Sequence, residues 1–143
     1  MTLTLLQART VIDAALEQAR AQHAQPLSVV VLDAGAHPVA FAREDGASLF
    51  RFDIARAKAT GALGMGADTR VIAGRAAKNP AFFQSVVAAT GGQLALSPGG
   101  VLIRDVEGAV IGAVGISGDT GEVDEACGLA GIRAAGLFHG DAR

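Results

Sequence analysis

The chain has 143 residues and a formal net charge of −2, and half of its residues are hydrophobic although only 4% are aromatic. This length suits one compact domain, predicted over residues 1–143, with a core of small and aliphatic side chains. The mixed charges and scarce aromatics argue against a nucleic-acid partner, and no apolar run approaches the ~20 residues of a membrane helix. With a single cysteine and no signal-peptide pattern at the start, we expect a cytoplasmic protein.

The chain opens with the pattern of a helix followed by a β-hairpin. A capping box at Thr4 starts the helical pattern, which has Leu5 and Ile12 on its apolar face. Two β-branched runs, 29–32 and 39–43, then flank a turn that contains glycine and proline. These runs predict the first two strands.

A second helix is predicted after Ser48, with an apolar face formed by Phe50, Ile54, Ala57 and Gly61. Arg51 and Lys58 lie on a different stripe of this helix. They are seven residues apart and therefore nearly aligned, so both cations face one cleft if the helix borders one. The alternative is a solvated, charged helix edge.

Two shorter helices are predicted to begin at Asp68 and at Asn79, the latter with proline at the first helical position. Phe82 and Phe83 are adjacent in the second of these helices. One ring should therefore enter the core while its neighbour points towards a pocket or a second subunit. A short strand is predicted over residues 93–97.

The last third of the chain predicts a hairpin that leads into a helix. The strands are 101–104 and 109–117, and the second is apolar at both alternations, which is typical of a central strand. Gly112 and Gly115 indicate a close approach of another element. A helix starts near residue 119, and its expected stripe is Val123, Cys127, Ala130, Ala134 and Leu137.

This order of elements predicts an α+β fold in which helices pack on an antiparallel sheet of five strands. The sequence contains no phosphate-binding loop, dinucleotide fingerprint or nucleophile elbow. No cysteine or histidine spacing suits zinc, so no metal site is predicted. The three histidines, His23, His37 and His139, fall in predicted loops or ends, where each is solvated or structural unless it supplies an axial nitrogen to haem.

Four segments together carry a family resemblance. They are Val31–Gly35, Phe41–Ala47, Ile54–Ala59 and Ile111–Gly118, with Asp124-Glu125 after the last. In this order they resemble the GlcG/HbpS family of haem-binding-like proteins and also the C-terminal domain of PduO-type proteins. The resemblance implies a profilin-like fold, assembly into homo-oligomers, and haem as a candidate cofactor. Members of the family are associated with haem or corrinoid binding, with catabolic loci and with sensing.

Two hypotheses of function follow. The first is a binding module for haem or another small planar or anionic ligand in a pocket between subunits, with Phe82 or Phe83 against the ligand and Arg51 or Lys58 near its carboxylates. The second is a small cytoplasmic enzyme, an isomerase or lyase acting on an organic acid, and whether the chain is an enzyme stays open. The candidate ligand-binding residues are Arg43, Arg51, Phe82 and Phe83, and the candidate catalytic residues are Asp45, Lys58, Asp124 and Glu125.

Overall fold

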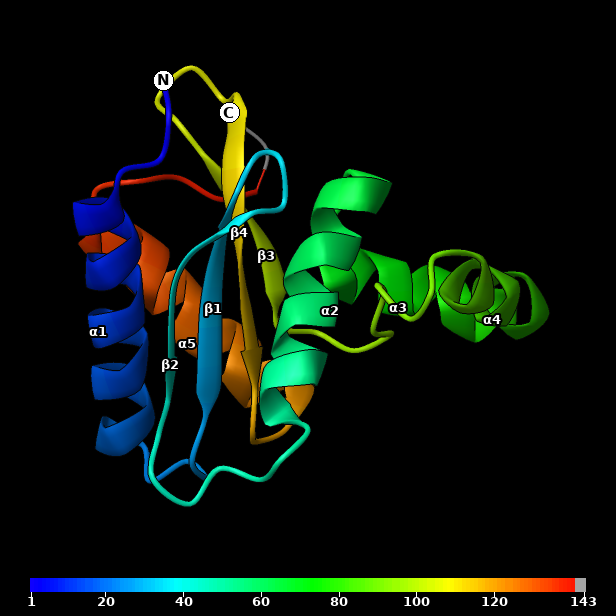
Figure 1. Ribbon diagram of the computed structural model, residues 1–143, viewed down its shortest axis with the longest axis horizontal. Coiled ribbons are helices and arrows are strands. Elements are labelled where there is room, and N and C mark those ends of the chain that lie inside the picture. Colours follow the sequence, from blue (N-terminus) through cyan, green and yellow to red (C-terminus); the bar gives the residue numbers. More distant parts are fainter. Residues whose placement is uncertain (141–143) are drawn as a thin grey trace.

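The computed structural model describes residues 1–140 of the chain (Figure 1). Within that range it has an α+β fold with five helices and four strands. The helices are α1 (Leu5–Ala21), α2 (Arg51–Met65), α3 (Thr69–Lys78), α4 (Pro80–Ala89) and α5 (Gly121–Ala134). The strands are β1 (Ser28–Asp33), β2 (Pro38–Arg43), β3 (Gly100–Arg104) and β4 (Val110–Ser117).

The strands form one antiparallel sheet in the order β2-β1-β4-β3. β4 is an interior strand, and all its residues after Val110 are buried, which confirms the predicted central strand. A Cβ on Gly112 would collide with the carbonyl oxygen of Leu32, and one on Gly115 would collide with that of Ala55. Both glycines are therefore required by the close approach of another backbone, as the sequence indicates.

Helices cover the two faces of this sheet differently. Figure 1 shows α1 and α5 together on one face and α2 on the other, while α3 and α4 extend away from the sheet. The α1/α5 side buries Val29, Val31 and Ile116. The α2 side buries Val30 and Leu32. The alternation along β1 thus separates two cores, as expected for a strand covered on both faces.

The predicted strand over residues 93–97 does not form, so the prediction of five strands is wrong by one. Leu94 instead packs with Ile72, Ala76 and Phe83 in a small separate core under α3 and α4. The outer edge of β3, where a fifth strand would pair, is already hydrogen-bonded to other segments. Thr69, Asp68 and Phe138 supply those partners. The profilin-like comparison stays a prediction.

The helix positions are close to those predicted, but two buried faces differ. In α2 the buried residues are Ala55, Lys58, Ala59, Gly61 and Ala62, whereas the predicted Phe50 is 66% exposed. In α5 they are Asp124, Cys127, Gly128, Gly131 and Ile132, so Ala134 is wrongly predicted. Leu5 in α1 is also exposed. Helices rich in alanine and glycine give little contrast between faces, and the periodicity therefore did not select the correct one.

Candidate ligand-binding site

A buried ion pair lies where the end of β4 meets α2 and α5. Lys58 Nζ is 3.1 Å from Asp124 Oδ2 and donates a hydrogen bond of 2.8 Å to the carbonyl oxygen of Ile116. The other carboxylate oxygen of Asp124 accepts a hydrogen bond from the amide of Asp119 at 3.0 Å. The two side chains are 3% and 1% exposed. The pair therefore joins two helices and a strand, and the prediction of a solvated edge at Lys58 is wrong.

Burial sets the electrostatics of this pair. Desolvation lowers the pKa of Lys58, and the charge of Arg51 lowers it further, while Asp124 opposes both effects. Desolvation likewise raises the pKa of Asp124, against the favourable charge of Lys58. Each ion therefore depends on the other to stay charged in a site with little water.

Gly99 packs directly against the Lys58 ammonium group. Gly99 adopts φ +126°, and a Cβ there would lie 2.8 Å from both Lys58 Nζ and the Ile116 carbonyl oxygen. A Cβ on Gly100 would collide with the carbonyl of Lys58. The backbone before β3 thus closes over the ion pair, which suits Lys58 and Asp124 to positioning these elements.

Polar side chains continue in one row across the end of the sheet. Ser28 in β1 is the direct partner of Arg43 in β2 and of Ser117 in β4. Arg51 at the start of α2 donates a hydrogen bond of 3.2 Å to Ser117 Oγ. The hydroxyl of Ser28 is buried and has no hydrogen-bond partner among residues 1–140. The row therefore holds two cations and one unsatisfied hydroxyl group.

Beside this row, the exposed Phe41 meets the partly buried Phe52, and the exposed Leu49 and Phe50 directly precede α2; we call these four residues the aromatic patch. Phe41 pairs with Val30 in the sheet and so points to the α2 side. α2 packs against β4, β1 and β3, whereas β2 packs against α1 on the opposite face. Phe41 is 54% exposed, and its ring meets Phe52 edge-on at a centroid distance of 4.6 Å.

The sequence analysis missed the aromatic patch because it assigned Phe50 to the core. The signal was present in the edge strand 38–43, where Phe41 and Arg43 alternate onto one face. The face of an edge strand is covered only if a helix reaches it, and sequence periodicity does not show how far α2 extends.

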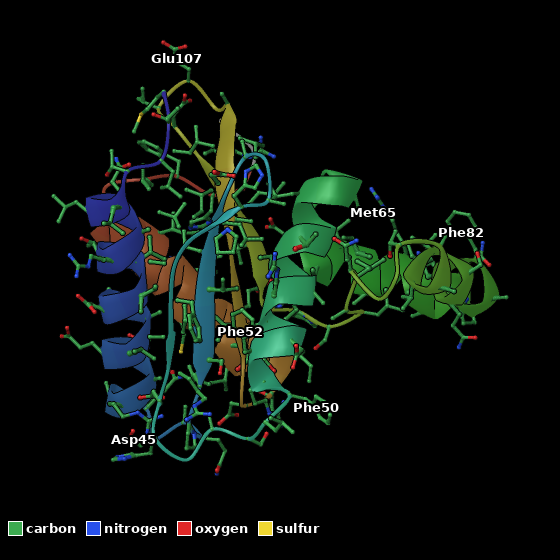
Figure 2. All side chains as sticks on the ribbon, in the orientation of Figure 1. Asp45, Phe50, Phe52, Met65, Phe82 and Glu107 are labelled. Atoms are coloured by element: carbon green, nitrogen blue, oxygen red, sulfur yellow. The ribbon has the colours of Figure 1, made fainter. Side chains whose placement is uncertain are left out.

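The other predicted site residues lie in three places. Arg43 and Asp45 line an open hollow of about 410 Å³ with Arg20, Pro26 and Glu44. Figure 2 shows Asp45 at the same end of the molecule as Phe50. Glu125 is held by Arg70 of α3 through an ion pair of 2.8 Å. The structure thus brings Arg43, Arg51, Lys58 and Asp124 to one end of the sheet, where Arg43 also lines a hollow with Asp45.

Phe82 and Phe83 are not part of this end of the sheet. Figure 2 shows Phe82 on the projecting helix α4, far from Phe50 and Phe52. Phe83 is buried and Phe82 is 52% exposed, which confirms that only one of the two rings enters a core. Within one chain, therefore, the two rings and the Arg51 and Lys58 cations do not form one pocket.

The remaining reactive side chains are dispersed. Among residues 1–140, no group of three or more His, Cys, Asp or Glu side chains is placed to hold a metal ion. Cys127 is buried, and desolvation raises its pKa to about 11, so it is a packed thiol. His37 lies beside Asp33 in the β1–β2 turn, whereas His23 follows α1 and His139 follows α5. No helix of the described range is long and apolar enough to cross a membrane.

Comparison with known proteins identifies the family. The family model described as haem degrading protein HbpS-like matches residues 3–133. The chain belongs to the HbpS-like family. This confirms the resemblance drawn from the four sequence segments. No curated protein matches the sequence.

Solved structures agree with this assignment. A crystal structure of HbpS has 28% sequence identity and a TM-score of 0.79, covering 93% of this chain and 89% of its own. A PduOC complex with haem has 24% identity and a TM-score of 0.87 over the whole of both chains. The protein ORFY of Klebsiella pneumoniae has 24% identity and a TM-score of 0.86, covering 95% of this chain and 92% of its own. At 24% identity, the similarity to PduOC and to ORFY shows a shared fold alone.

Proposed function

We propose that this HbpS-like protein binds a planar anionic ligand, haem being the leading candidate, on the aromatic patch, in a pocket that a second copy of the chain completes. The observation that carries the proposal is the α2-side face of β2, where the exposed Phe41 meets Phe52 and shares its face with Arg43, while Arg51 directly precedes Phe52 at the start of α2. Membership of the HbpS-like family and the haem complex of PduOC support the choice of ligand.

Haem binding requires an apolar surface, cations that bind the propionates and an axial ligand to the iron. The patch and the arginines beside it are suited to the first two. Exposed phenylalanine rings provide an apolar surface for a flat macrocycle. Arg43 and Arg51 are suited to binding the two propionates, because a guanidinium group binds carboxylates with paired hydrogen bonds. The buried, unsatisfied Ser28 hydroxyl in the same row offers a further polar contact if the end of the sheet opens.

The third requirement, an axial ligand to the iron, is not met by the residues of the patch. His23, His37 and His139 lie on other segments. A second copy facing the patch is one source of such a ligand. It would also cover Leu49 and Phe50, which are 77% and 66% exposed in one chain and are costly to leave in water.

No observation favours the alternative of an isomerase or lyase acting on an organic acid. Lys58 and Asp124 neutralise each other behind Gly99, and Glu125 is paired with Arg70. Asp45 lines an open hollow with Arg43, away from the buried ion pair. The four candidate catalytic residues therefore do not surround one space that a substrate enters, and we propose positioning roles for Lys58 and Asp124.

A haemin titration followed by absorption spectroscopy tests the proposal. Phe41→Ser and Arg43→Met should each weaken haemin binding by about tenfold or more, since each removes a contact of 1–3 kcal/mol. Phe82→Ser is the matched control, because Phe82 and Phe41 are almost equally exposed. Light scattering with and without haemin measures whether two copies enclose the ligand.

The possible outcomes separate the alternatives. If Phe82→Ser weakens binding and Phe41→Ser does not, the ligand surface is on α4 and the aromatic patch is the wrong site. Saturable haemin binding by a monomer would contradict the pocket between subunits. If no haemin binds at all, the assignment of haem fails.

A further inference from the structure

A second hollow, remote from the aromatic patch, lies between α3, β3 and the segment after α5. Its volume is about 380 Å³, and the residues that line it are Gly66, Ala67, Asp68, Val71, Arg75, Leu102, Arg104 and Gly140. None of these residues was a candidate in the sequence analysis, and the proposed function does not use them.

Two arginines supply the charge of this hollow. Arg75 is exposed in the last turn of α3 and forms no ion pair among residues 1–140. Arg104, at the end of β3, donates from Nη1 to the carbonyl oxygen of Gly108 at 3.0 Å. Its Nε is buried and has no hydrogen-bond partner among residues 1–140. This Nε is shielded from the hollow as it is from water, so Arg104 contributes its positive charge to the hollow and not a hydrogen bond from Nε.

Among the described residues that line the hollow, Asp68 supplies the carboxylate, which is hydrogen-bonded to the edge of the sheet. Asp68 occupies the N-cap position of α3, but its side chain makes no capping bond and instead accepts a hydrogen bond of 2.8 Å from the Leu102 amide. This bond ties α3 to the edge of the sheet. Asp68 is more than half buried, and desolvation raises its pKa. The charge of Arg104 lowers this pKa, so Asp68 interacts with Arg104, whereas Arg75 has no carboxylate in an ion pair among residues 1–140.

The walls of the hollow indicate the size and kind of the anion. Val71, which is 44% exposed, and Leu102 are the larger apolar residues. Gly66 at the end of α2 has no atom within 4 Å of a Cβ built on it. The space thus admits a short hydrocarbon body next to the guanidinium group of Arg75, which is suited to bidentate binding of a carboxylate, and the positive charge of Arg104.

We propose that this hollow is a binding site for a small organic carboxylate, held by Arg75 and Arg104 and packed against Val71 and Leu102. The site is independent of haem binding at the aromatic patch. It needs neither a second copy nor a cofactor, so its test and that of the proposed function fail separately.

Titration with sodium succinate, followed by amide chemical shifts in NMR spectra, tests the site in the full chain. Succinate should give saturable shifts at the amides of Val71, Leu102 and Arg104, and the uncharged analogue succinamide should give none. Arg75→Met should raise the dissociation constant of succinate about tenfold, as expected for the loss of a charge-assisted contact. Arg133→Met, another exposed arginine in the last turn of a helix, should bind as the unmodified chain does.

Asp68→Asn provides a test that does not rely on removing a cation. Asparagine keeps the acceptor for the Leu102 amide and removes the negative charge, so this variant should bind succinate several-fold more tightly. The proposal is overturned if succinate and succinamide give the same shifts, or if Arg75→Met and Arg133→Met bind alike. Saturation by inorganic phosphate without saturation by succinate would reject the carboxylate class.

Discussion

Replacing Lys58 by methionine tests whether the buried ion pair fixes the end of the sheet. Methionine keeps most of the aliphatic volume but removes the ammonium group. Asp124 then stays buried with one hydrogen bond among residues 1–140, from Asp119, and the Ile116 carbonyl loses its donor. Removing one partner of a buried ion pair lowers the free energy of unfolding by about 3–5 kcal/mol, which is a large part of the typical 5–15 kcal/mol of a domain.

The loss should depend on pH in a predictable direction. Without Lys58, the desolvation of Asp124 is opposed only by the hydrogen bond from the Asp119 amide, so the pKa of this carboxyl in the folded variant rises further above its value in the unfolded chain. The folded variant then binds more protons than the unfolded one between these two pKa values. Its stability therefore falls as pH rises through that interval, and acidification to its lower end restores part of the loss.

Urea denaturation followed by circular dichroism at two pH values measures both effects. The double variant Lys58→Met/Asp124→Asn should recover much of the loss, because neither charge remains buried. Lys78→Met, at the exposed end of α3, is the control and should change the stability by less than about 0.5 kcal/mol. A small loss in Lys58→Met, or a double variant no more stable than the single one, would refute the reasoning.

Further variants test the packing. Gly112→Val should lower the stability measured in thermal melts by about 3 kcal/mol or more, because the new Cβ meets the Leu32 carbonyl. Gly74→Ala, on an open face of α3, should raise the stability by ~0.5 kcal/mol. Equal effects of the two variants would mean that the backbones do not approach closely at Gly112. Cys127, with a pKa of about 11, should stay unlabelled by Ellman's reagent near pH 8 until the chain unfolds, and rapid labelling of the folded protein would contradict its burial.

Local chemistry made most of the fold predictable. The capping box at Thr4 forms, Asn79 is followed by a helix that begins at Pro80, and the two hairpins appear where β-branched runs flank turn residues. The segment 93–97 was misread because short apolar alternation also suits a loop that covers a small core. Such a segment forms a strand only where a sheet edge is free to pair with it. Here the outer edge of β3 is hydrogen-bonded to Asp68 and Thr69, which lie in a different segment of the chain.

The candidate site was predictable only in part. Seven-residue spacing correctly aligned Arg51 and Lys58 on one side of α2, but their different surroundings depend on packing. Lys58 lies under Gly99 and faces Asp124, 66 residues further along the chain, whereas Arg51 reaches the end of β4. A sequence pattern reports which residues share a helix face, and it does not report what the rest of the chain places opposite them.

The proposed function gives the buried pair and the aromatic patch complementary roles at this end of the sheet. Lys58 binds the carbonyl of Ile116, and the next residue, Ser117, holds Arg51. The ion pair therefore sets where the end of β4 lies, and through it the position of a guanidinium group beside the patch. A positioning role and a ligand-binding role are distinguishable: Lys58→Met should lower stability far more than the affinity of the folded protein for haemin, and Arg43→Met should do the reverse. If both variants weaken haemin binding equally at a pH where both are folded, Lys58 contacts the ligand and the closed arrangement behind Gly99 must open.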